Sequence, residues 1–311
     1  MPLSPLCCPP MRTIRVQTPA TTANLGSGFD TLGLALGLYN TLTVEPAEAG
    51  VEVYVSGEGA DRLPKNGRNT VVRAMRRLFG RMGRALPPLR LRQENAIPLG
   101  RGLGSSSAAI VGGLMAANAW AGEPFTREQL LHLASALDGH PDNVAACLFG
   151  GLVVTALEGE ETFYARLPVC HPLQVVLYIP VFETRTPLAR QDLPECYSRR
   201  DAVFNVSRAA LTTAAFATGR WDLLRVSMQD RMHQPYRLQR HAHLPRLVEA
   251  ALAAGARGAA LSGSGPTIAA FTDADPAPLA RALEECAAAG GLPGRVLCVP
   301  VDHHGAQVTV E

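Results

Sequence analysis

The chain has 311 residues, of which 47% are hydrophobic and 18% are charged, and its formal net charge is +2. This length suits two domains of ordinary size, and the small net charge without a basic tail argues against a protein that tracks a nucleic acid backbone. No apolar run approaches the ~20 residues that span a bilayer, which argues against a membrane protein.

The cysteines indicate a reducing compartment. There are seven, an odd number, with no CxxC pair and no cysteine and histidine spacing typical of metal ligands. We therefore expect a cytoplasmic protein. The opening MPLSPLCCPP is too short and too rich in proline for a secretory signal, so we expect residues 1–11 to be a disordered leader, with Met11 as an alternative start.

Alternating apolar and polar residues predict that the chain opens with β structure. The three predicted strands lie at residues 12–18, 38–45 and 51–56. Pro19 is expected to end the first strand in a turn. The three helices predicted next lie at residues 70–79, at residues 105–121 and from Thr126 to just before Gly139. Gly112 and Gly113 weaken the second helix, which implies that a neighbour packs closely there.

A Gly/Glu stretch at residues 158–161 is the expected domain boundary. It divides the chain into an N-terminal domain of residues 12–160 and a C-terminal domain of residues 161–311. The strands predicted around and after it lie at residues 152–157, 173–180, 258–261 and 296–301. The accompanying helices lie at residues 202–217, 244–254 and 276–289. This mixed order predicts an α+β fold with layered sheets and helices.

Residues 98–109, PLGRGLGSSSAA, predict a phosphate-binding loop. Gly102 and Gly104 permit backbone conformations that a Cβ disfavours, so successive N–H groups can converge on an anion. The helix that begins near Ser105 adds free N–H groups and the positive end of its dipole. An ordinary capped helix is the alternative, although a cap needs neither glycine. The common P-loop is excluded because Lys65, far upstream, is the only lysine.

Four separated segments share one resemblance. They are residues 19–36 (PATTANLGSGFDTLGLAL), the phosphate-binding loop, residues 138–151 (DGHPDNVAACLFGG) and residues 261–267 (LSGSGPT). Together they resemble the GHMP kinase superfamily, and the first and third resemble the homoserine kinases within it. The resemblance implies a two-domain fold, with an N-terminal domain like domain 2 of ribosomal protein S5 and a C-terminal ferredoxin-like α/β sandwich. It also implies MgATP as phosphoryl donor, homoserine as acceptor in threonine biosynthesis, and a possible homodimer.

The same resemblance places the triphosphate of ATP against the phosphate-binding loop. The residues it implies are Pro98, Leu99, Gly100, Arg101, Gly102, Leu103, Gly104, Ser105, Ser106, Ser107 and Ala108. Ser106 and Asp138 are the implied Mg²⁺ ligands, and oxygen is the donor that Mg²⁺ prefers. Asp138 replaces a glutamate that family members often carry, and a plain turn residue is the alternative there. Asn69 resembles a residue of the adenine pocket, with an N-cap as the alternative.

Homoserine carries an ammonium, a carboxylate and a hydroxyl, so its pocket needs groups of both charge signs. The resemblance implies Asp30 for the ammonium, and Asn24 and Asn143 for fixing the amino acid and its hydroxyl. It implies Arg190 and Arg237 for the carboxylate, because a guanidinium can form two parallel hydrogen bonds. For each arginine, a solvated surface charge is the alternative.

Phosphoryl transfer depends mainly on positioning and charge neutralisation. Asn143 stands where related kinases for mevalonate and galactose place an aspartate, and an amide accepts no proton at neutral pH. We therefore expect catalysis without a dedicated base, with Asn143 orienting the hydroxyl and with Thr186 and Arg190 approaching from the second domain. A plain loop capped by Thr186 is the alternative there. Asp142 is the rival base, and His140 is a further candidate.

Two other functions stay open on the sequence alone. One is a kinase of the same fold for a sugar or an isoprenoid alcohol, and the other is a nucleotide-binding regulatory protein without turnover. The combination of Asp30 with Arg190 and Arg237 argues for an amino acid, because a sugar needs neither charge sign.

Overall fold

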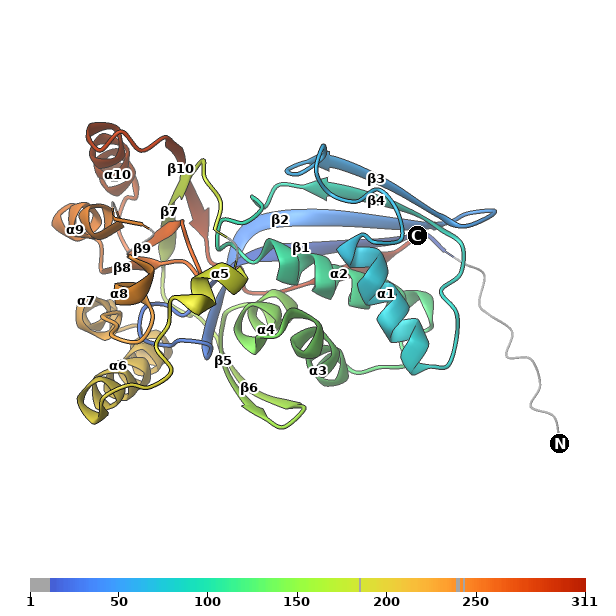
Figure 1. Cartoon of the computed structure of the whole chain (residues 1–311), viewed down its shortest axis with the longest axis horizontal. Helices are drawn as coiled ribbons and strands as arrows, with labels where there is room; N and C mark the ends of the chain where they lie inside the picture. Colours follow the sequence, from blue (N-terminus) through green and yellow to red (C-terminus); the bar gives the residue numbers. More distant parts are fainter. Residues whose placement is uncertain (1–11, 185, 239–240, 243) are drawn as a thin grey trace.

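The computed structural model describes residues 12–184, 186–238, 241–242 and 244–311, so the leader expected at residues 1–11 lies outside the described part. The fold contains two sheets, each covered by its own group of helices. Figure 1 shows α1 to α4 together on one side of the larger sheet, α6 to α10 around the smaller sheet, and α5 between the two groups. No helix in the described ranges is long and apolar enough to cross a membrane.

The larger sheet has seven strands. They are β1 (Ile14–Ala23), β2 (Leu32–Pro46), β3 (Val51–Gly57), β4 (Leu89–Asn95), β5 (Leu152–Glu158), β6 (Glu161–Leu167) and β11 (Gln307–Val310). The order is β11-β1-β2-β4-β3, and β5 joins β2 to β6. All pairs are antiparallel except β3 with β4.

The turn expected at Pro19 is wrong, because β1 continues through Pro19 to Ala23. The pairing of β1 with β2 shifts register between Pro19 and Ala20, and such an irregularity accommodates a residue that has no N–H to donate. The extended strand carries Thr21 and Thr22 to the edge of the cavity described below.

Four helices pack on the larger sheet. They are α1 (Thr70–Arg81), α2 (Ser105–Trp120), α3 (Arg127–Asp138) and α4 (Pro141–Phe149). The close packing predicted for α2 is confirmed: a Cβ on Gly113 would lie 2.6 Å from the carbonyl oxygen of Val71 on α1, and one on Gly112 would clash with Leu42 of β2. The sequence analysis treated the HPDN residues as a turn, but they begin α4, with Pro141 in its first turn, where no N–H is needed.

The smaller sheet has four antiparallel strands in the order β10-β7-β9-β8. They are β7 (Gln174–Pro180), β8 (Gly258–Leu261), β9 (Ile268–Thr272) and β10 (Gly294–Pro300). The helices of this part are α5 (Thr186–Gln191), α6 (Arg199–Thr218), α7 (Leu224–Ser227), α8 (Gln234–Arg237), α9 (Leu244–Ala253) and α10 (Ala277–Ala289). Leu247 of α9 and Leu283 of α10 share a buried apolar cluster with Val176 of β7.

The structure differs from the domain boundary expected at residue 160. That position lies in the hairpin between β5 and β6, whose strands pair from Leu152 with Leu167 to Glu158 with Glu161. The last strand, β11, also returns to the larger sheet and pairs with β1. We propose that the first domain extends to Leu167 and includes residues 307–310.

Candidate active site

A cavity of about 460 Å³ lies where the two parts of the chain meet. Its lining comes from the turn after β1, the phosphate-binding loop, the end of α3, the start of α4, the segment around α5, Arg237 of α8 and the turn between β8 and β9. The four segments that carry the family resemblance therefore meet at one cavity, although they are far apart in the sequence.

The phosphate-binding loop has the backbone that its glycines predict. Gly100, Gly102 and Gly104 have φ values of 63°, 71° and 68°, and no side chain caps the first turn of α2. A Cβ on Gly104 would clash with the hydroxyl of Thr21. Because no side chain occupies the N–H groups that begin α2, they are available to an anion.

The glycine-rich turn after β8 supports this loop from the second domain. The Ser262 hydroxyl lies 2.6 Å from the Gly102 carbonyl oxygen and 2.9 Å from the Thr22 hydroxyl. The backbone N–H of Gly263 donates to the Ala23 carbonyl oxygen at 3.1 Å. The prediction that residues 261–267 fold against the phosphate-binding loop is confirmed.

Asp138 supplies a buried carboxylate beside the same helix terminus. Its Oδ2 accepts a hydrogen bond of 2.7 Å from the Ser107 hydroxyl. Burial raises the pKa of Asp138, while the hydroxyls of Ser107 and Ser106 and the nearby His140 act in the opposite direction. A carboxylate with hydroxyl oxygens at a phosphate-binding loop fits a hard cation such as Mg²⁺. The described residues include no cluster of three or more His, Cys, Asp or Glu side chains, so phosphate oxygens and water would complete the coordination.

Asp30, Arg190 and Arg237 lie together at the opposite side of the cavity. Nη2 of Arg190 lies 2.7 Å from each carboxylate oxygen of Asp30. Arg237 is only 2% exposed, which contradicts the alternative of a solvated surface charge, and burial lowers its pKa. The Nε atoms of both arginines are buried without a hydrogen-bond partner. Two buried N–H donors that lack an acceptor are suited to a carboxylate ligand.

Asn24 and Asn143 already use their amides within the protein. Asn24, at a φ of 71°, accepts from the backbone N–H of Asp30 and donates to the Gly263 carbonyl oxygen, both at 3.0 Å. Asn143 accepts from the Thr21 hydroxyl at 2.7 Å and donates to Oδ1 of Asp142 at 3.1 Å. Asn24 therefore holds the turn after β1, and Asn143 joins β1 to α4.

Two ionisable groups flank Asn143. Burial and then the charge of Asp30 raise the pKa of Asp142 to about 7, although the backbone and amide N–H groups of Asn143 favour its ionised form. Burial and then the charge of Arg190 lower the pKa of His140. At neutral pH the cavity therefore contains a neutral imidazole and a carboxyl group near its midpoint of titration.

The two parts of the chain match two known domains. Residues 69–151 match the GHMP kinases N terminal domain, and residues 212–290 match the GHMP kinases C terminal domain. A homoserine kinase of Deinococcus radiodurans is 46% identical over 301 residues, which cover 96% of this chain and 98% of that protein. One from Carboxydothermus hydrogenoformans is 43% identical over 291 residues, with 94% and 95% covered. The chain belongs to the homoserine kinase family.

Solved structures agree with this homoserine kinase assignment and confirm the predicted two-domain α+β fold. The crystal structure of homoserine kinase from Cytophaga hutchinsonii has a TM-score of 0.87 at 30% identity, with 96% of this chain and 98% of that chain covered. A mevalonate kinase from L. major, at 16% identity and a TM-score of 0.70, with 92% and 94% covered, shares the fold.

Most of the nucleotide residues expected for a homoserine kinase line the cavity. Pro98 and residues 100–107 do so, whereas Leu99 and Ala108 are absent from its lining. Asn69 is also absent: its Oδ1 caps α1 by accepting from Val71 N, and its Nδ2 donates to Pro64 and Gln93. Because these bonds use the whole Asn69 amide, the structure favours the N-cap over the adenine contact.

Thr186 begins α5, and its side chain lies outside the described part of the structure. The sequence analysis missed Thr184, which is buried and lines the cavity with its hydroxyl 3.1 Å from Nε2 of His241. The backbone N–H of Thr184 also donates to the Gly100 carbonyl oxygen at 2.9 Å. No pattern in the sequence separates Thr184 from other loop threonines, because its position depends on a contact between domains.

Proposed function

We propose that this chain transfers the γ-phosphoryl group of ATP to the side-chain hydroxyl of L-homoserine, which forms O-phospho-L-homoserine for threonine biosynthesis. One observation carries the proposal. A single cavity combines a lysine-free phosphate-binding loop with Asp30 and with two arginines whose buried Nε atoms lack acceptors. These are the groups that a nucleotide and an amino acid zwitterion require together.

On the nucleotide side, the N–H groups at the start of α2 would hold the phosphates of ATP, as its helix dipole favours negative charge. Ser106 and Asp138 would hold Mg²⁺, which neutralises charge on phosphate oxygens when bound. An additional cation would also offset the cost of burying the Asp138 carboxylate, to which Ser107 already donates.

On the acceptor side, Asp30 would bind the ammonium of homoserine, and Arg190 and Arg237 would bind its carboxylate. The ion pair between Asp30 and Arg190 keeps both groups oriented before substrate arrives. A zwitterion supplies each of them with a new partner of opposite charge, so neither charge is left unpaired when the substrate enters.

Asn143 would orient the acceptor hydroxyl, with Thr186 and Arg190 approaching the phosphates from the second domain. Asn143 is itself fixed by Thr21 and Asp142, so its amide has one defined direction. No base takes part: positioning and the positive charge around the phosphates supply the stabilisation. A homodimer and a cytoplasmic location remain predictions.

The test is a coupled ADP-release assay with MgATP that compares L-homoserine with L-threonine, L-serine, mevalonate and galactose, with and without EDTA. We expect turnover with homoserine that EDTA abolishes. Turnover with mevalonate or galactose alone would contradict the roles of Asp30, Arg190 and Arg237. ATP binding without turnover of any acceptor would indicate a regulatory protein.

A further inference from the structure

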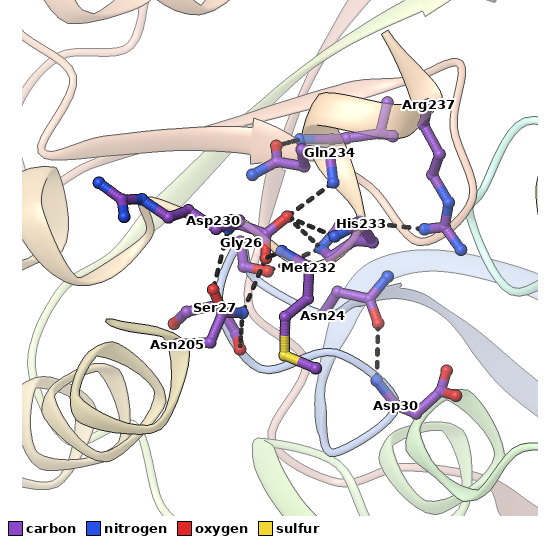
Figure 2. Close-up of polar contacts among 12 residues, drawn as sticks. Asn24, Gly26, Ser27, Asp30, Asn205, Asp230, Met232, His233, Gln234 and Arg237 are labelled. Atoms are coloured by element: carbon purple, nitrogen blue, oxygen red, sulfur yellow. Dashed lines mark hydrogen bonds and ion pairs between the residues drawn. The ribbon is translucent and has the colours of Figure 1, made fainter. Parts of the chain in front are cut away.

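A buried polar network lies behind the substrate-binding residues, outside the cavity (Figure 2). At its centre the fully buried carboxylate of Asp230 accepts four hydrogen bonds. Oδ1 accepts from the Asn205 amide and from Met232 N, both at 2.8 Å, and Oδ2 accepts from His233 N at 3.0 Å and Gln234 N at 2.6 Å. These bonds fix the backbone at the start of α8, which carries His233 just before it and Arg237 at its end.

The contacts of the His233 ring define its protonation state. Nη1 of Arg237 lies 3.1 Å from Nδ1 of His233, and a guanidinium can only donate, so Nδ1 is the acceptor and carries no proton. Nε2 therefore carries the proton and donates to the carbonyl oxygen of Gly26 at 2.7 Å. The ring is fully buried, so neutral imidazole with its proton on Nε2 is the form that satisfies both contacts.

The Gly26 end of this link belongs to the turn that carries Asn24 and Asp30. Gly26 has a φ of 76°, and a Cβ there would clash with the Met228 carbonyl oxygen. The amide of Asn205 donates to the Ser27 carbonyl oxygen at 3.1 Å. Groups of the second domain therefore hold this turn of the first domain by its backbone.

The Arg237 end of the link reaches the cavity. Nη1 of Arg237 donates to the Gly263 carbonyl oxygen at 2.9 Å, the same oxygen that accepts from Asn24. The Phe29 ring stacks on His233 with centroids 5.3 Å apart, and the Arg237 guanidinium lies 5.4 Å from its centroid. With Nη1 occupied in this way, the unpaired Nε of Arg237 has a fixed direction.

We propose that His233 is a positioning residue for homoserine: its Nδ1 holds the Arg237 guanidinium, and its Nε2 proton fixes the ring to the turn that carries Asp30. This inference rests on the proposed function. It assigns to a side chain outside the cavity the task of keeping the cationic and anionic halves of the amino acid pocket in register. Because the link ends at Arg237, its loss affects the carboxylate of homoserine and leaves ATP unaffected.

Two variants separate the two ring nitrogens. In His233→Asn, the amide Oδ1 replaces Nδ1 and retains an acceptor for Arg237, whereas in His233→Gln the amide Nε2 replaces the ring Nε2 and that acceptor is lost. We expect His233→Gln to raise the KM for homoserine about tenfold or more, as a lost hydrogen bond to a charged group does. His233→Asn should stay within about threefold of the wild type, and the KM for ATP should change less than about twofold in both.

A smaller acceptor shows whether the effect acts through the carboxylate. 3-Amino-1-propanol is homoserine without its carboxylate, and we expect the two variants and the wild type to bind it equally, as substrate or as competitive inhibitor. His304→Gln, at an exposed histidine, is the control for loss of an imidazole. Equal KM values for His233→Gln and His233→Asn, or an equal rise in the KM for ATP, would contradict the inference.

The wild-type protein provides a test that needs no variant. Long-range ¹H–¹⁵N NMR of the histidine rings should show His233 with its proton on Nε2 throughout pH 6 to 8. A proton on Nδ1, or titration of this ring in that range, would overturn the inference. Wild-type chain that does not phosphorylate homoserine would refute the proposed function, whereas active wild type with an unchanged His233→Gln variant would refute this inference alone.

Discussion

At the scale of single residues, the charges of the acceptor pocket differ in how far they are satisfied. Asp30 and Arg190 form an ion pair in which each side chain is 35% exposed, so water still screens it. Arg237 is buried, and its Nη1 is held by His233 and Gly263 while its Nε has no acceptor. A carboxylate ligand should therefore gain more from Arg237 than from Arg190.

Arg237→Lys should raise the KM for homoserine by about 10- to 100-fold, because an ammonium on a flexible stem cannot reproduce two hydrogen bonds from a guanidinium. The KM for ATP should stay near the wild-type value. Arg231→Lys is the matched control, since Arg231 lies in the same segment but pairs with Asp201 at half-exposed positions. Steady-state kinetics would contradict this prediction if both variants behaved alike.

Asp142→Asn should make the protein more stable at high pH. The folded-state pKa of Asp142, about 7, lies above the ordinary 3.8, so its protonated form is favoured in the fold. Its contribution to stability is complete below pH ~4 and is lost as the pH rises to and through about 7. At pH 9 the variant should exceed the wild type by up to about 4 kcal/mol, as about 1.4 kcal/mol per pKa unit implies.

The measurement is urea unfolding of both proteins at several values of pH. The Asn side chain retains an oxygen for the N–H groups of Asn143 and never ionises, so the variant differs from the wild type in charge alone. A wild-type stability that does not fall between pH 4 and 7 relative to the variant would refute a raised pKa.

At the scale of elements, the phosphate-binding loop depends on what lies directly beneath it. The loop is held between β1, through Thr21, and the turn after β8, through Ser262. Gly102 and Gly104 are therefore required for two reasons, their positive φ values and the absence of space for a Cβ. The sequence predicts the first reason, and only the fold reveals the second.

Gly104→Ala tests the second reason, with Gly122→Ala as its control. Both glycines have positive φ, 68° and 84°, but a Cβ on Gly122 has no atom within 4 Å, whereas one on Gly104 clashes with Thr21. Gly122→Ala should cost about 1–2 kcal/mol of stability from backbone strain. Gly104→Ala should cost more and should raise the KM for ATP at least about tenfold, a loss of about 1.4 kcal/mol in binding. Equal effects in thermal unfolding and in ATP kinetics would show that only the backbone angle matters.

At the scale of the whole molecule, the two domains share one cavity and exchange structural elements. The segment 181–184 of the second domain bonds to the phosphate-binding loop, and β11 completes the sheet of the first domain at the end of the chain. Removal of residues 307–311 should therefore destabilise the first domain by exposing the edge of β1. Removal of Glu311 alone is the control, and unfolding midpoints and light scattering would compare the two.

The sequence predicts the parts of the site that local chemistry determines. The phosphate-binding loop, Asp30 and Arg237 all lie at the cavity as predicted, because glycine pairs and charged groups in short motifs carry their own signal. Thr184 and the extension of β1 through Pro19 could not be predicted, since each depends on pairing with a distant segment. The same holds for the return of residues 307–310 to the first sheet.

The central claim is that this cavity phosphorylates homoserine by positioning and charge, without a base. The most direct test is the kcat of Asp142→Asn with homoserine and saturating MgATP. The account predicts a value within about fivefold of the wild type, because the Asn oxygen still orients Asn143. A general base contributes about 10²- to 10⁴-fold, so a fall of that size with an unchanged KM for homoserine would assign proton abstraction to Asp142 and contradict the account.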